Sequence, residues 1–263
     1  MSEALMGLPG QRLRAKQAGD EAQLMHWVNQ TGFGLSLAET PESDQSEWLV
    51  LADAHSNSPL ACLRLVPRLG LRLPRYSYHV GRVVHAAAEL GLFCTQRTLL
   101  LGNDHTGESE LADLACAPGL PADLQVTYLS ALVQAALARI AAAPGTYGET
   151  LIVELAGLRD HPGEGAEAES NSPFWRGLGA HFYAGQPSQA QARFGDAWRS
   201  HLAALLPRQT LYLSFLSEAA QAAVGKVGEA GQAAAAALAA SGFGDAQHVR
   251  IDDGGPLWQL RLR

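Results

Sequence analysis

The residues best able to do chemistry stand together after a run of leucines, in the segment GNDHTGESEL at positions 102–111. Asn103, Asp104 and His105 offer an amide, a carboxylate and an imidazole in consecutive positions. A carboxylate can hold an amine or a guanidinium, and an imidazole can move a proton near neutral pH. The competing interpretation is a turn, in which these polar side chains bond the local backbone and Gly107 takes a positive φ.

A second candidate site follows, where a strand-like run ends before a long apolar helix. Many α/β proteins hold a phosphate on the backbone N–H groups at such a helix start. The connecting residues here are Pro118, Gly119, Leu120, Pro121, Ala122 and Asp123. Each proline removes a donor, and Asp123 repels a phosphate. No Lys or Arg occurs between positions 102 and 134. The position at a helix start therefore favours phosphate binding, but the side chains at that position do not.

Patterning predicts an α+β or mixed α/β fold. Apolar runs predict strands at 11–16, 47–53, 59–67, 77–87, 97–103, 107–118, 150–157, 211–216, 248–252 and 257–263. Helical spacing predicts helices at 19–33, 122–142, 172–182, 217–225 and 231–240. Several strands are consecutive, which favours a central mixed sheet flanked by helices. The length fits one domain, 1–263, with candidate sub-lobes 1–145 and 146–263.

Composition argues against several classes of function. The net charge is −7 and the basic residues are scattered, so we expect no nucleic-acid partner. Metal-ligand spacings such as HxH and HExxH do not occur, nor do GxSxG, GxGxxG or a P-loop, so we expect no metal. The N-terminus lacks a signal-peptide pattern, no apolar run reads as a membrane span, and the three cysteines form no CxxC pair. We therefore expect a cytoplasmic protein without membrane association.

Five segments in chain order resemble the arginine N-succinyltransferase family: YSYHVGRVVHAAAELGLF, TLLLGNDHTGESEL, NSPFWRGLGAHFY, LLPRQTLYLSFLSEAAQAAVGKV and SGFGDAQHVRIDDGGP. QTGFGLSL at 30–37 resembles the family's first loop more weakly. Members transfer a succinyl group from succinyl-CoA to the α-amino group of arginine, on a fold like the GCN5-related N-acyltransferases (GNAT). The resemblance implies a GNAT-like fold, succinyl-CoA as co-substrate, an amino acid acceptor, and a homo-oligomer or a paralogous partner subunit.

The same resemblance assigns roles to single residues. Those implied to bind the amino acid are Asn103, Asp104, His105, Ser172, Trp175 and Asp253. Glu110 and Leu114 would lie on the acyl-CoA, where backbone N–H groups near Leu114 polarise the thioester carbonyl. The family's proton-transfer histidine corresponds to Gly228, so the catalytic group stays unassigned.

Three functions remain open at this point. The first is an arginine N-succinyltransferase-like enzyme that uses arginine or ornithine. The alternative is a catalytically silent paralogue, acting as a partner subunit or a ligand-binding module, because the phosphate loop is altered and position 228 lacks an imidazole. The third is an α/β domain whose resemblance is only ancestral. The chain also stops soon after DGGPLWQ, where typical members continue.

Overall fold

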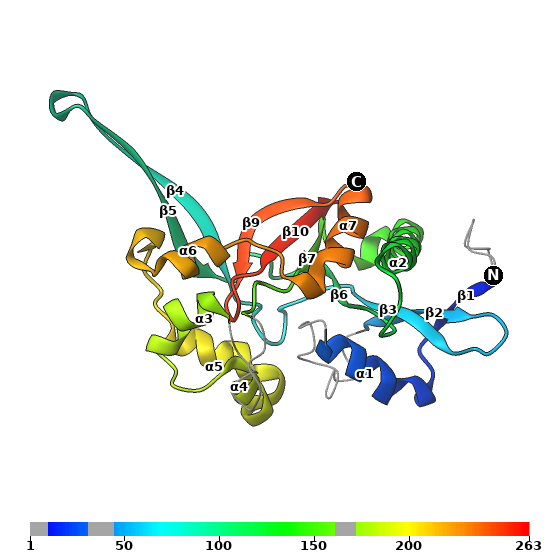
Figure 1. The fold of residues 1–263 in the computed structure, drawn as a ribbon. Helices are drawn as coiled ribbons and strands as arrows, with labels where there is room; N and C mark the ends of the chain where they lie inside the picture. The colour runs from blue at the N-terminus through cyan, green and yellow to red at the C-terminus, as the bar shows by residue number, and fades with distance from the viewer. Residues whose placement is uncertain (1–9, 31–44, 161–171, 263) are drawn as a thin grey trace.

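The computed structural model describes residues 10–30, 45–160 and 172–262, and a ten-stranded sheet runs through its centre (Figure 1). The strand order is β1-β2-β3-β6-β7-β10-β9-β4-β5-β8. The strands are β1 (Gln11–Ala15), β2 (Glu47–Asp53), β3 (Pro59–Val66), β4 (Ser77–Ala87), β5 (Leu92–Gly102), β6 (Ser109–Cys116), β7 (Thr150–Glu154), β8 (Leu211–Tyr212), β9 (Gly244–Arg250) and β10 (Pro256–Arg261). Neighbours are antiparallel except β6 and β7, which run parallel. The predicted mixed sheet flanked by helices is confirmed.

Helices cover both faces of this sheet. They are α1 (Glu21–Gln30), α2 (Ala122–Ala142), α3 (Pro173–Gly177), α4 (Pro187–Phe194), α5 (Trp198–Leu205), α6 (Glu218–Ala223) and α7 (Gln232–Ala240). Helices α2 and α7 pack together over one face, whereas α1 lies against β6 on the other. The remaining helices form a lobe beside β4, β5 and β9 (Figure 1).

Strand β2 shows how the sequence builds the two layers. Successive side chains of a strand point to opposite faces of the sheet. Leu49 and Leu51 pack into the core under α2, and Trp48 and Val50 pack into the core under α1. A strand buried on both faces reads as a continuous apolar run, which is how EWLVLAD reads.

Helix α2 has the predicted bounds at both ends, 122 and 142. By length and composition it is also apolar enough to cross a bilayer, which differs from the prediction that no apolar run reads as a membrane span. In the structure its apolar side packs on β2, β3, β6 and α7. The side chains buried there are Tyr128, Leu129, Leu132, Val133, Ala136 and Ile140, so it serves as a core helix.

Other predictions differ from the structure in detail. The strand expected at 211–216 is only two residues long and continues as a 3-10 turn at Leu213–Phe215. The strand expected at 97–103 begins earlier, at Leu92, because it pairs with β4 along eleven residues. Helices α4 and α5 were not predicted. The first loop at 30–37 lies outside the described residues apart from Gln30.

The sheet also crosses the proposed sub-lobe boundary, because β4 and β5 of the first half pair with β9 and β8 of the second. That residues 1–263 form one domain nevertheless remains a prediction.

The parallel pair β6–β7 is short and leads into an irregular strand. Its register joins Ser109 to Leu151 and Glu110 to Ile152. Beyond that, the pairing of β6 with β3 shifts, and Asp113 has a φ of 57°. Such a bulge in a non-glycine residue redirects the side chains around it. Asp113 lines a small hollow that shares Arg64, Arg75 and Glu110 with the larger cavity described next.

Candidate active site

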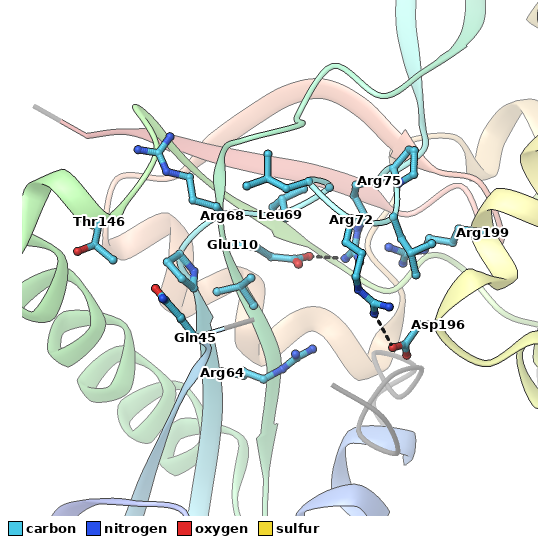
Figure 2. Close-up of a pocket in the computed structure, with 16 residues that line it drawn as sticks. Gln45, Arg64, Arg68, Leu69, Arg72, Arg75, Glu110, Thr146, Asp196 and Arg199 are labelled. Carbon is cyan, nitrogen blue, oxygen red and sulfur yellow. Dashed lines mark hydrogen bonds and ion pairs between the residues drawn. The ribbon is translucent and has the colours of Figure 1, made fainter. Parts of the chain in front are cut away.

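A cavity of about 590 Å³ opens between the segment that joins β3 to β4 and the region around α5 (Figure 2). Most of its polar lining is charged. The charged residues are Arg64, Arg68, Arg72, Arg75, Glu110, Asp196 and Arg199. Figure 2 shows Arg72, Arg75 and Arg199 on one side of this cavity, with Arg64 and Arg68 at other parts of its wall.

Each outer arginine has a different kind of partner. The Arg64 Nε lies 2.6 Å from an Asp113 carboxylate oxygen, and both side chains are buried. Arg68 donates to two backbone carbonyls, and Arg72 reaches Asp196 at 3.4 Å on the exposed rim. Arg68 therefore brings positive charge without a carboxylate to offset it.

The floor of the cavity is a buried ion network centred on Glu154. Glu154 accepts a hydrogen bond from Arg199 at 2.6 Å and from the Arg75 Nε at 3.1 Å. Arg75 also donates to Glu110. Burial opposes the charged form of Glu154, but Arg199, Arg75 and Arg250 outweigh it and lower its pKa to about 2. Burial dominates at Glu110, where it raises the pKa despite Arg75.

This arrangement suits an anionic ligand. Five arginines of the lining stand against four carboxylates, those of Glu110, Asp196 and the buried partners Asp113 and Glu154. The cluster keeps a net positive charge inside a partly enclosed space, where charge-assisted hydrogen bonds are strong. Planar guanidinium groups bind carboxylates and phosphates in two-point fashion.

The predicted residues Asn103, Asp104 and His105 do not line this cavity, but the loop that carries them contacts its rim. The N–H of Gly107 donates to the carbonyl of Leu69, a lining residue, which fixes the loop against the rim. The carbonyl of Asn103 accepts from Thr106 and Gly107 has a φ of 89°, as the turn interpretation expects.

Asp104 does more than form a turn, because its carboxylate lies 3.0 Å from Nε2 of His248. His248 also places Nδ1 2.8 Å from the carbonyl of Ala246. Both partners are acceptors, so both bonds form only when the His248 ring is protonated. The edge of His105 packs on the His248 ring, at 4.5 Å between centroids.

His105 is a neutral base in this setting. Burial, followed by the charge of His248, lowers its pKa to about 4. Its Nε2 is buried and has no hydrogen-bond partner among the described residues. The loop therefore offers an exposed carboxylate and an uncharged imidazole at the edge of a cationic cavity.

Ser172, Trp175 and Asp253 come together in a separate buried cluster. Ser172 caps α3 by accepting from the Trp175 N–H at 3.2 Å, and its hydroxyl donates to the carbonyl of Asp253. Trp175 is fully buried in the core of the helical lobe. Asp253 accepts from the N–H groups of Gly157 and Gly255. These contacts shape the β9–β10 turn, and a substrate role for the three residues stays a prediction.

Asp253 also links this turn to the ion network. Arg250 lies between Asp252 and Asp253 and is buried, with Asp252 at 2.6 Å and Asp253 at 3.2 Å. Its charge contributes to the low pKa of Glu154. Substitutions in the turn are therefore expected to act on the cavity through charge.

The predicted acyl-CoA residues separate in the structure. Glu110 lines the cavity at the parallel pair, whereas the side chain of Leu114 is buried in the core under α2. Leu114 follows the bulge at Asp113, so only its backbone could face a thioester. The start of α2 is exposed from Pro121 to Leu124 and has no side-chain cap.

Gly228 has no room for a side chain. A Cβ at this position would lie 2.2 Å from the carbonyl oxygen of Gly157, and the Gly228 N–H donates to the carbonyl of Ala156. Position 228 is thus closed by backbone atoms. With this backbone, an imidazole cannot be restored there by substitution alone.

We expect Gly228→Ala to lower the free energy of unfolding by about 1–3 kcal/mol, because the methyl group must displace backbone. Thermal melting should fall by several degrees. Gly145→Ala is the matched control, since nothing lies within 4 Å of a Cβ there. Equal melting temperatures for the two variants would contradict the packing described at Gly228.

Sequence reasoning missed the arginines that line the cavity. The segment RLVPRLGLRLPR holds Arg64, Arg68, Arg72 and Arg75 in twelve positions with no acidic residue, which was the available signal. Arg199 and Glu154 carried no such signal, because they lie far apart along the chain and meet only in the folded protein. His248 was likewise not selected.

Comparisons with known proteins agree on one family. A family model described as arginine N-succinyltransferase beta subunit matches residues 11–263. The arginine N-succinyltransferases of Citrobacter koseri and Escherichia coli O6:K15:H31 are 31% and 30% identical, over 95% of this chain and 76% of each relative. The solved arginine/ornithine succinyltransferase subunit AI from Pseudomonas aeruginosa is 24% identical, with a TM-score of 0.71 over 95% of this chain and 76% of that one. The fold is therefore shared with that subunit.

Proposed function

The chain belongs to the arginine N-succinyltransferase family, and we propose that it transfers a succinyl group from succinyl-CoA to the α-amino group of arginine. The observation that carries the proposal is the arginine-lined cavity that Glu110 of β6 also lines. Both the succinyl group and the amino acid bring a free carboxylate, and guanidinium groups bind carboxylates well. Ornithine presents the same α-amino acid end.

The acceptor arginine has an α-carboxylate at one end and a guanidinium at the other, and the two groups need protein partners of opposite charge. In the proposal, Arg199 and Arg72 on the α5 side hold carboxylates, because both line the cavity. Asp104, on the loop that contacts the cavity rim, holds the substrate guanidinium, since its side chain is 59% exposed while one oxygen contacts His248. The acceptor would then lie with its charged ends apart and its amine over β6.

The reaction needs a base for the amine and support for the carbonyl oxygen. We assign the base to Glu110, which lines the cavity and whose pKa burial raises. After Glu110 takes the ammonium proton, the amine attacks the thioester carbon and the carbon–sulfur bond breaks. Backbone N–H groups at the bulge near Leu114 support the oxyanion, and the thiolate of CoA leaves with the second proton that the attacking nitrogen loses.

A direct assay tests the function. The purified chain is mixed with succinyl-CoA and arginine, and CoA release is followed with a thiol reagent while the product is weighed by mass spectrometry. Turnover that depends on arginine supports the proposal. Binding of both ligands without turnover would instead identify the silent paralogue. Absence of acyl-CoA binding at millimolar concentration would reject the transferase and favour the partner subunit.

The altered start of α2 gives a separate prediction about acyl-CoA. If the CoA phosphates lie there, Asp123→Asn should tighten CoA binding about twofold to fivefold, because a helix N-terminus and a carboxylate compete for the anion. Titration calorimetry measures the change. Glu218→Gln, at the exposed start of α6, is the control with the same loss of charge. Unchanged affinity for Asp123→Asn would place the phosphates elsewhere.

The expected cytoplasmic location fits this proposal, because acyl-CoA and free amino acids meet there. The composition and the described side chains call for no metal in the reaction as proposed.

A further inference from the structure

Strands β4 and β5 form a ribbon that extends far beyond the rest of the sheet (Figure 1). β4 pairs with β9 only over Ser77–His79, and β5 pairs with β8 only at Thr98 and Leu99. Between these contacts, residues 80–97 pair only within the β4–β5 ribbon and with no other described strand. We call residues 80–97 the arm. Both of its edges present unpaired backbone N–H and C=O groups.

The arm exposes large apolar side chains. Leu90 is 79% exposed, Phe93 76%, Val84 49% and Leu92 48%. A lone two-stranded ribbon is marginally stable in water, and exposed apolar surface of this kind marks an interaction site. Open edges are usually protected by Lys or Pro, and the arm contains neither. This composition is typical of a surface that is buried when another protein binds.

The arm also carries two positive charges that no described carboxylate neutralises. Arg82 and Arg97 are directly opposite each other, which is unfavourable for like charges. Neither forms an ion pair with a described carboxylate; Asp245 lines the same depression but is hydrogen-bonded to Gln247. The acidic residue of the arm, Glu89, is in the turn, about 20 Å away by strand rise.

These groups form a self-complementary face. The registers Arg82↔Arg97, Val84↔Thr95 and Ala86↔Phe93 place all six residues on one face of the ribbon. The face runs from a basic region near the body, through Val84, to the aromatic Phe93 and then Glu89 at the tip. The same face of a second arm in antiparallel orientation is therefore complementary to it in charge and in apolar contact.

We propose that the arm is a dimerisation arm, which packs antiparallel on the arm of a second copy about a twofold axis near His85. An axis there places Glu89 beside Arg82 and Arg97 of the second copy, because these lie three to four residues on either side of it. Phe93 then covers Val84 of the second copy.

Charge complementarity within the arm fits a second copy. The arm has two arginines at its base, Arg82 and Arg97, and one glutamate, Glu89, at its tip. An arm turned end for end therefore sets each charge against the opposite one. A twofold contact of this type is isologous and closes at two copies. The inference does not depend on the transferase reaction.

Sedimentation equilibrium of the full chain over a concentration series tests the arm. The wild-type chain is expected to be a dimer, and Phe93→Ser to be a monomer with an unchanged far-UV spectrum. Glu89→Arg should raise the dimer dissociation constant at least tenfold. Adding Arg82→Glu and Arg97→Glu to Glu89→Arg should restore dimerisation, because the two charges exchange sides. Glu149→Arg, exposed outside the arm, is the control and should leave the dimer intact.

Two results would overturn the proposal. One is a wild-type chain that stays monomeric up to about 100 µM, an affinity too weak for a specific dimer, whatever other protein the arm then binds. The other is a dimer that survives both Phe93→Ser and Glu89→Arg, which would place the interface elsewhere. Failure of the charge exchange to restore a dimer lost in Glu89→Arg would reject the antiparallel arrangement.

Discussion

Glu154→Gln is expected to lower the free energy of unfolding by about 3–5 kcal/mol, which is the usual cost of breaking a buried ion pair from one side. Glu154 is buried and pairs with Arg199 at 2.6 Å and with Arg75 at 3.0 Å. The glutamine keeps the shape but not the charge. Arg199 then has no carboxylate in direct contact among the described ion pairs. Equilibrium unfolding in guanidinium chloride measures the loss.

The control for this experiment is Asp196→Asn. Asp196 also faces an arginine in the cavity, but Arg72 is half exposed and the separation is 3.4 Å. Exposed pairs of this kind contribute about 0–1 kcal/mol. A similar loss for Asp196→Asn and Glu154→Gln would show that the buried network adds no stability of its own.

The same network predicts how stability depends on pH. The pKa of Glu154 in the folded protein, about 2, is below its ordinary value of 4.5. Its stabilising contribution is therefore complete above pH 4.5 and is lost as the pH falls toward 2. Glu154→Gln should flatten that part of the stability profile. Glu110 acts in the opposite sense, because a raised pKa favours the folded state at low pH and loses that effect as the pH rises.

Much of the fold follows from local patterns. The helix at 122–142 repeats apolar residues at helical spacing, and Pro144 follows its end, so both bounds could be predicted. The β9–β10 hairpin follows from a turn at Asp253-Gly254-Gly255, where Gly254 has a φ of 70°. Helices α4 and α5 have a weaker apolar repeat, because each is eight residues long, although Pro187 at the start of α4 and Gly195 at its end were available signals.

The candidate site was only half predictable. Asp104 and His105 are adjacent and polar after an apolar strand, so sequence alone selected them. The cavity beside them is made by Arg75, Glu154 and Arg199, which come from a connecting segment, a strand end and a helix. No spacing along the chain encodes that meeting, because the parallel pairing of β6 and β7 creates it.

Glu110→Gln is expected to have the largest effect on turnover, lowering kcat by about 10²–10⁴ if Glu110 removes the amine proton. Glutamine can still accept a hydrogen bond from Arg75 but cannot take a proton. The Michaelis constants for arginine and succinyl-CoA should change little, because the carboxylate contacts of the ligands are assigned to arginines. Asp196→Asn, on the rim of the same cavity, should retain most of the activity.

The pH profile distinguishes this chemical role from a structural one. Glu110 must be ionised to act, so kcat/KM of the wild-type chain should fall as the pH drops below the raised pKa of Glu110. The residual activity of Glu110→Gln should lack that fall. A lower melting temperature with an unchanged profile would assign Glu110 to the stability of the network with Arg75. In that case His105, whose Nε2 is unpaired among the described residues, becomes the base to test by His105→Gln.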